Sequence, residues 1–193
     1  MKSRNWTVLI IGGASGTGKS TIAYEIAKLY GISVLELDDI HCVVKSLLPA
    51  DKFPAMCNPD GNKWRELGVD WNVRWLKDVS NEMSEFLVKL VERHVEDDVP
   101  VIIEGDFIVP DLVKPILSSK VKALFILEFD RNQIARNFQS REGGELDCYR
   151  ADISVSYNEW IQKTSDELGV AVLESRPWDN ALSRAVEALF PCR

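Results

Sequence analysis

The chain has 193 residues, 46% of them hydrophobic, and this composition predicts a single compact domain over 1–193. Its formal net charge of −7 gives no sign of the basic surface typical of nucleic-acid-binding proteins, so we expect no nucleic-acid partner. No apolar run approaches the length of a membrane-spanning helix, and the first residues lack a signal-peptide pattern. We therefore expect a cytoplasmic protein without a membrane partner.

Short apolar runs alternate with longer amphipathic segments along the chain. Because strands that are joined through helices favour right-handed crossovers, the pattern predicts an α/β domain with a mainly parallel sheet. Two excursions interrupt the alternation, at 45–70 and 130–152. Strands are predicted at 7–11, 33–37, 101–107, 122–129 and 170–174, and helices at 20–30, 71–95, 130–141, 155–168 and 179–189.

The segment after the first predicted strand fits the pattern G-x-x-x-x-G-K-[ST]. Its glycines let backbone N–H groups curl around a phosphate, and the following helix N-terminus adds free donors. We predict that Lys19 reaches the β- and γ-phosphates of ATP from the solvent side and that Ser20 ligates Mg²⁺. A tight turn with an incidental lysine is the structural alternative. The predicted nucleotide-binding residues are Gly13, Ala14, Ser15, Gly16, Thr17, Gly18, Lys19, Ser20 and Thr21.

Acidic residues follow the second and third predicted strands, on the side where open α/β sheets bind ligands. Asp38 and Asp39 either orient a substrate hydroxyl and accept its proton, or one of them caps the next helix. Glu104 is predicted to hold Mg²⁺ directly or through water, and Asp106 to contact substrate. The alternative for Glu104 and Asp106 is a turn with solvated acids.

The glycine-rich loop, the "LDDIH" segment and the later "VIIEG" segment together resemble the small-molecule kinases of the P-loop class. The uridine kinase and nicotinamide riboside kinase group is similar, and "VIIEGDFIVP" also resembles 2-phosphoglycerate kinase-like proteins. The resemblance implies a three-layer fold with five parallel strands in the order 2-3-1-4-5. It also implies that Asp38 is the acid on the acceptor side.

Basic residues on and after the predicted helix 130–141 suggest a lid over the donor phosphates. The resemblance implies that Arg136 and Arg141 close over the transferring phosphate, with Gly143 and Gly144 as a hinge. A solvated basic helix face is the alternative.

Two further segments are candidates for ligand contact. The resemblance implies that Arg176 lies over the adenine of ATP and that Pro177 fixes its loop, whereas Trp178 is expected in the core. Four aromatic residues of 45–75 line the acceptor pocket or belong to the ordinary core, and Trp71 is predicted to contact the acceptor. These four are Phe53, Trp64, Trp71 and Trp75.

The sequence thus predicts an ATP- and Mg²⁺-dependent kinase of a small hydroxylated molecule, acting as a monomer or homodimer. A regulatory ATPase is one alternative, but hydrolysis does not need the acid after the second strand. A nucleotide-sensing binder without catalysis is another, against which Lys19 and Ser20 argue. The four cysteines form no C-x-x-C pair and are expected to be reduced thiols.

Overall fold

The computed structural model describes residues 4–57 and 63–189 and contains one sheet of five parallel strands. The strand order is β2-β3-β1-β4-β5, which confirms the predicted order. The strands are β1 (Val8–Gly12), β2 (Ser33–Glu36), β3 (Val101–Gly105), β4 (Val121–Leu127) and β5 (Val172–Glu174).

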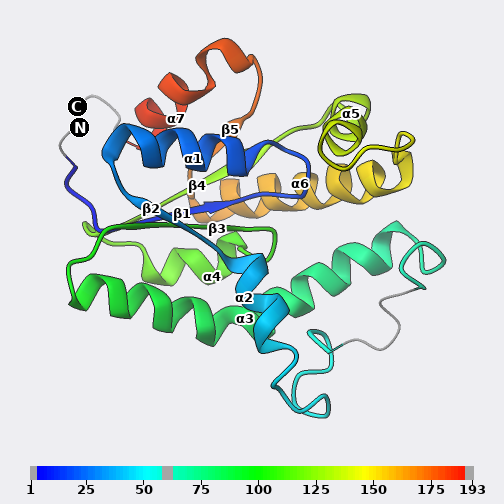
Figure 1. The fold of residues 1–193 in the computed structure, drawn as a ribbon, viewed down its shortest axis with the longest axis horizontal. Coiled ribbons are helices and arrows are strands. Elements are labelled where there is room, and N and C mark those ends of the chain that lie inside the picture. Colours follow the sequence, from blue (N-terminus) through cyan, green and yellow to red (C-terminus); the bar gives the residue numbers. More distant parts are fainter. Residues whose placement is uncertain (1–3, 58–62, 190–193) are drawn as a thin grey trace.

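Helices cover both faces of the sheet and complete the three layers (Figure 1). Helices α1 and α7 pack on one face, and α3, α4 and α6 on the other. The helices are α1 (Lys19–Tyr30), α2 (Leu37–Val44), α3 (Val69–Glu96), α4 (Pro110–Val113), α5 (Arg131–Glu142), α6 (Cys148–Leu168) and α7 (Ala181–Leu189), with 3-10 turns η2 (Lys114–Ile116) and η3 (Trp178–Asn180).

The central strand β1 explains why the sequence shows a continuous apolar run there. Val8 and Ile10 pack into the core beneath α3 and α6, whereas Leu9 and Ile11 pack into the core beneath α1 and α7. All four side chains are fully buried. A strand that is covered on both faces needs apolar residues at every position, and β1 therefore lies in the middle of the sheet.

Two differences from the predicted elements bear on the candidate site. Helix α6 begins at Cys148, seven residues before the predicted start at 155, because Asp147 caps it by accepting a hydrogen bond from the Arg150 N–H. Helix α2 begins at Leu37, directly after β2, so the chain turns without a loop there. Both differences move charged residues of the candidate site onto helices.

Cys42, Cys57 and Cys148 are free thiols, and Cys192 lies outside the described residues. None of the helices in the described ranges is both long and apolar enough to cross a bilayer.

Candidate active site

The turn between β1 and α1 has the backbone shape of a phosphate cradle. Gly13 has a φ of +143°, and a Cβ at this position would lie 2.3 Å from the carbonyl oxygen of Ile126. Gly18 is the N-cap of α1 with a φ of +89°, and having no side chain it leaves the helix N–H groups free for an anion. The residues present therefore fit a bound triphosphate.

Polar side chains from distant segments hold this loop in place. The Ala14 N–H donates to Asn158 Oδ1 at 3.2 Å, and Asn158 Nδ2 donates to the carbonyl of Glu128 at 2.8 Å. Asn137 Nδ2 donates to the carbonyl of Gly16 at 2.8 Å. Asn158 is fully buried. Sequence analysis missed both asparagines, because nothing in the local sequence of α5 or α6 points to the loop.

Lys19 lies at the first position of α1 and is buried, with 5% of its surface exposed. Its Nζ atom is 2.5 Å from Asp106 Oδ1 and 3.8 Å from Glu104 Oε2. The prediction that Lys19 faces solvent and contacts only phosphate is therefore wrong, since the ends of β1 and β3 are adjacent in the sheet. Burial by itself lowers the pKa of Lys19, but the carboxylates of Asp106, Glu104 and Asp38 together raise it by more. The net pKa is therefore raised, and the side chain stays charged.

Asp38 lies behind this ion pair, in the first turn of α2. Its Oδ1 accepts a hydrogen bond from the Asp106 N–H at 3.1 Å, and Gly105 leaves room for it, because a Cβ there would lie 3.0 Å from the same oxygen. Burial, then the charge of Asp106, raises the pKa of Asp38 to about 7, against the opposing effect of Lys19. The N-cap of α2 is Glu36, so the capping alternative for Asp38 and Asp39 is wrong.

Glu104, at the end of β3, is almost completely buried with 3% of its surface exposed. Burial raises its pKa, which the charge of Lys19 and a hydrogen bond with the Ser20 side chain oppose. Its Oε2 makes no hydrogen bond within the described part of the chain. Glu104 is buried in β3, so the alternative of a solvated acid in a turn is wrong for it. Asp106 lies in the turn after β3 and is partly exposed, but it is paired with Lys19.

The side chains of Ser20 and Glu104 contact one another through a hydrogen bond, and they are the residues that would hold a cation on the phosphates. Across residues 4–57 and 63–189, no three His, Cys, Asp or Glu side chains form a metal cage. Mg²⁺ in phosphoryl-transfer sites needs few protein ligands, because phosphates and waters supply the others. A hydroxyl and a buried carboxylate oxygen without a hydrogen bond fit that requirement.

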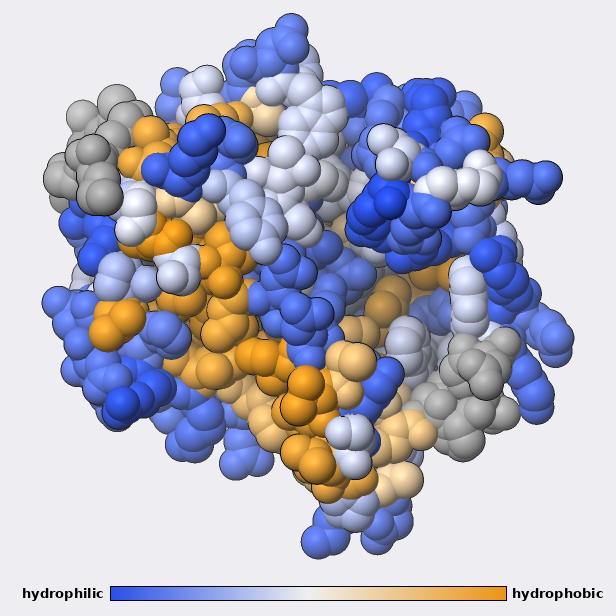
Figure 2. Space-filling model, viewed as in Figure 1, coloured by the Kyte–Doolittle hydropathy of each residue, from blue (hydrophilic) through white to orange (hydrophobic). Residues whose placement is uncertain are grey.

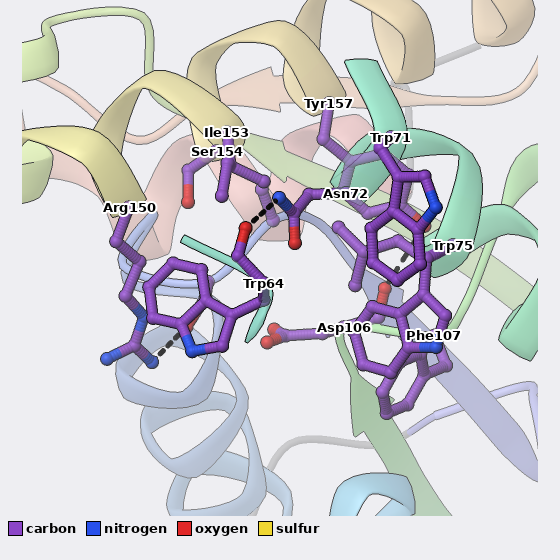
Figure 3. Close-up of a pocket in the computed structure, with 13 residues that line it drawn as sticks. Trp64, Trp71, Asn72, Trp75, Asp106, Phe107, Arg150, Ile153, Ser154 and Tyr157 are labelled. Carbon is purple, nitrogen blue, oxygen red and sulfur yellow. Dashed lines mark hydrogen bonds between the residues drawn. The ribbon is translucent and has the colours of Figure 1, made fainter. Parts of the chain in front are cut away.

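A cavity of about 390 Å³ opens beside the loop, with Ala14 and Ser15 on its wall. Figure 2 shows the surface hollowed between α5 and the start of α3. In the close-up, the Asp106 carboxylate points into the space between Trp64 and Trp75 (Figure 3). The other lining residues are Trp71, Asn72, Leu76, Phe107, Arg150, Ile153, Ser154 and Tyr157.

The four aromatic residues differ in whether they line this cavity. Trp64, Trp71 and Trp75 line it, whereas Phe53 packs against Phe86 with ring centroids 6.3 Å apart. Asp39 is exposed on α2 and is not among the described residues that line the cavity.

Arg150 is a site residue that sequence analysis missed. Its Nη2 lies 3.3 Å from Ser15 Oγ, its Nη1 lies 2.8 Å from Glu142, and its guanidinium lies 4.1 Å from the centre of the Phe138 ring. Arg150 falls inside the segment 130–152 that was predicted to be a lid. Because the helix was predicted to start only at 155, nothing placed this arginine next to the loop.

The two predicted lid arginines differ in position. Arg141 lines a groove of about 410 Å³ together with Gly16, Lys19 and Ser20. Arg136 is exposed and lies 3.1 Å from Gln133 and 3.9 Å from Asp130, and it is not among the described residues that line that groove.

The segment after β5 borders the donor side of the loop. Arg176 forms ion pairs with Glu128 at 2.7 Å and with Asp130 at 3.1 Å, and it lines a cavity of about 520 Å³ together with Pro177. Trp178 is 37% exposed and lies over Gly18, where the missing Cβ makes room for the indole. The expectation that Trp178 belongs to the core is therefore wrong.

The β1–loop–α1 unit and the 2-3-1-4-5 sheet define the fold of the P-loop kinases that act on small molecules. A gluconokinase from Sinorhizobium meliloti has this fold, with a TM-score of 0.51 and 16% identity over 97% of this chain and 93% of its own. A sugar kinase from Janibacter sp. gives a TM-score of 0.53 at 19% identity, over 96% of each chain. At these identities the likeness establishes the fold alone.

Curated relatives of the chain carry the name 2-phosphoglycerate kinase. The protein from Methanocaldococcus jannaschii is 27% identical over 179 residues, which is 87% of this chain and 58% of the relative. The protein from Methanopyrus kandleri is 29% identical over 168 residues, which is 83% of this chain and 51% of the relative. The chain thus spans little more than half the length of these relatives. No family model matches it.

Proposed function

We propose that the protein transfers the γ-phosphate of ATP to a hydroxyl group of a small molecule, with Mg²⁺ as the metal. The observation that carries this proposal is the convergence of Lys19, the acids Asp38, Glu104 and Asp106, and a small-molecule-sized cavity at one edge of the sheet. A nucleotide switch or sensor needs the loop but has no use for the cavity and the acid beside it. The curated relatives and the fold support the same class of reaction.

On the donor side, residues 13–21 bind the phosphates through backbone N–H groups, and Lys19 turns from Asp106 to the β- and γ-phosphates. Ser20 and Glu104 hold Mg²⁺, which neutralises phosphate charge when it is bound. Arg176 and Pro177 contact the adenine from the loop after β5. Because Arg176 is already held by Glu128 and Asp130, its guanidinium plane is oriented before the nucleotide arrives.

On the acceptor side, Asp106 contacts the hydroxyl group in the cavity, and Asp38 accepts its proton as the bond to phosphorus forms. The oxygen of the acceptor bonds to the γ-phosphorus, the bond between that phosphorus and the bridging oxygen breaks, and ADP leaves with the electron pair. A carboxyl group whose pKa is about 7 is well suited to this proton transfer near neutral pH. Asp106 lines the cavity while Asp38 lies behind it, so Asp106 is the alternative base.

Arg141 and Arg150 neutralise the charge on the transferring phosphate from the segment 130–152. Arg141 borders the groove along the loop and Arg150 contacts Ser15 of the loop itself. Arg136 would have to move with a closing lid, for which Gly143 and Gly144 supply the turn between α5 and α6. We also propose that the protein is cytoplasmic and acts as a monomer or homodimer.

The test is a screen of small alcohols with ATP and Mg²⁺ in which ADP release and the phosphorylated product are both measured. ADP release that depends on an alcohol, together with its phosphorylated product, supports the proposal. ADP release at the same rate without any alcohol would instead identify a regulatory ATPase. Binding of ATP without turnover under all conditions would identify a nucleotide-sensing protein.

A further inference from the structure

The cavity beside the loop is walled mainly by aromatic rings. Five of its lining residues are aromatic: Trp64, Trp71, Trp75, Phe107 and Tyr157. Its volume of about 390 Å³ lies within the ~300–1,000 Å³ range of small-molecule sites. Such walls bind apolar, flat surfaces well, since aromatic side chains bury a large area at a small cost in conformational entropy.

The rings on one side of the cavity are held in place by their neighbours. Trp75 Nε1 donates a hydrogen bond to the carbonyl of Ala55 at 2.9 Å, and its ring meets Phe107 edge-on at 6.1 Å. Phe107 in turn packs edge-on against His41 at 4.6 Å. Trp71 lies nearly parallel to Trp75, with an angle of 4° between the planes (Figure 3). A flat ligand therefore meets a wall whose orientation is already set.

The charges of the cavity do not suit an anionic acceptor. Arg150 is the cation among the described lining residues, and it is paired with Glu142. In the reaction proposed above it acts on the transferring phosphate, so it does not offset a further negative charge on the acceptor. Asp106 is neutralised by Lys19, and it loses that partner when Lys19 turns to the phosphates of ATP. A phosphorylated acid would bring two or more negative charges into a space that then holds an unpaired carboxylate. Desolvating such charges without matching donors is strongly unfavourable.

We propose, as a refinement that rests on the kinase function proposed above, that the acceptor is an alcohol with a flat apolar ring and no negative charge. Its ring lies against Trp71 and Trp75, and its hydroxyl group points to Asp106 and the loop. The acceptor class thus differs from 2-phosphoglycerate, the compound in the names of the curated relatives.

The first experiment compares acceptors that differ in charge. 4-(Hydroxymethyl)benzamide and 4-(hydroxymethyl)benzoate have nearly the same shape, and only the second is an anion. Uridine is a second neutral ring alcohol, and 2-phosphoglycerate, gluconate and shikimate are further anions. We expect product from the neutral ring alcohols, with a kcat/KM at least about tenfold above that of the anions. Transfer to the anions at equal or higher kcat/KM would overturn the inference and leave the kinase function intact. Absence of transfer to every compound would overturn the kinase function itself, and the inference with it.

The second experiment removes the aromatic wall. Trp71→Ala should lower kcat/KM for the ring alcohol up to about tenfold relative to kcat/KM for glycerol, which has no ring, and leave the KM for ATP unchanged. The matched control is Trp6→Phe, which alters a tryptophan buried against Tyr30 on the other side of the sheet. An unchanged ratio between ring alcohol and glycerol in Trp71→Ala would contradict the proposed stacking, whatever the absolute activity of the variant.

Discussion

The donor and acceptor sides of the candidate site are built in opposite ways. The donor side is one continuous stretch, 13–21, in which neighbouring residues form the cradle that we propose binds phosphate. The acceptor cavity is assembled beside this loop from residues of three further segments, around Trp64 to Leu76, at Asp106 and Phe107, and at Arg150 to Tyr157. A site that is local in sequence can be inherited as a motif, whereas an assembled site changes when any one segment changes.

The same difference appears in how the two sides are stabilised. The donor loop depends on backbone geometry, which only glycine provides at a φ of +89°. The acceptor cavity depends on rings that pack on one another and on Asp106, whose N–H donates a hydrogen bond to Asp38 at the start of α2. Substitutions of single residues can therefore test the donor side and the acceptor side separately.

The largest effect is expected for Lys19→Ala, which should lower phosphoryl transfer by ~10³–10⁵-fold, because a cation on the transferring phosphate is lost. The ligand-free variant should also unfold at lower urea concentration, since Asp106 and Glu104 lose their shared partner. The measurements are steady-state turnover and urea unfolding. Lys28→Ala, an exposed lysine near the end of the same helix, is the control. Turnover equal to that of the native protein at saturating ATP would disprove the role of Lys19.

Next in size is Asp38→Asn, which should lower acceptor phosphorylation by ~10²–10⁴-fold and leave ATP affinity nearly unchanged. In the native protein, kcat/KM should fall as the pH drops below about 7, because Asp38 then takes up a proton, and this acid limb should vanish in the variant. Asp39→Asn, an exposed neighbour, is the control. A greater loss in Asp106→Asn, with the acid limb still present in Asp38→Asn, would assign the proton acceptor to Asp106.

The arginines of 130–152 should have smaller and graded effects. Arg141→Ala and Arg150→Ala should each lower turnover by about 10²-fold with little change in ATP affinity, because they act on charge in the transition state. Arg136→Ala should have a weaker effect, since Arg136 is not among the described residues that line the groove. Arg93→Ala, at the end of α3, serves as the control. If all three lid variants matched the control, the segment would be an ordinary solvated surface.

The smallest expected effect is a change in the free energy of unfolding. Unlike the substitutions above, which lower activity, this one should stabilise the protein. Because the pKa of Asp38 is raised to about 7 in the folded protein, ionising this group destabilises the fold, increasingly from about pH 4 to pH 7. Asp38→Asn should therefore raise the free energy of unfolding of the ligand-free protein at pH 8, on the order of 1–3 kcal/mol. The gain should shrink as the pH falls towards 4. Urea unfolding at pH 8 and pH 5 measures it, and an equal difference at both values would contradict the raised pKa.

The sequence by itself determined the three-layer fold and the donor loop. Alternating apolar runs and amphipathic helices favour a parallel sheet, and the glycine pattern with Lys19 and Ser20 predicts the cradle-shaped loop through local backbone geometry. The acids at or directly after the ends of β2 and β3 were also predictable, because the carboxyl ends of parallel strands meet at one edge.

Only the tertiary structure decided which side chains surround that loop. Asn137, Arg150 and Asn158 reach it from helices whose own sequences show no sign of the contact. The burial of Lys19 and the exposure of Trp178 were likewise set by packing across the sheet edge, not by residue type. A local sequence pattern predicts backbone geometry. The distance between residues more than a hundred positions apart depends instead on how whole helices and strands pack. That is why the acceptor cavity, unlike the donor loop, became visible only in three dimensions.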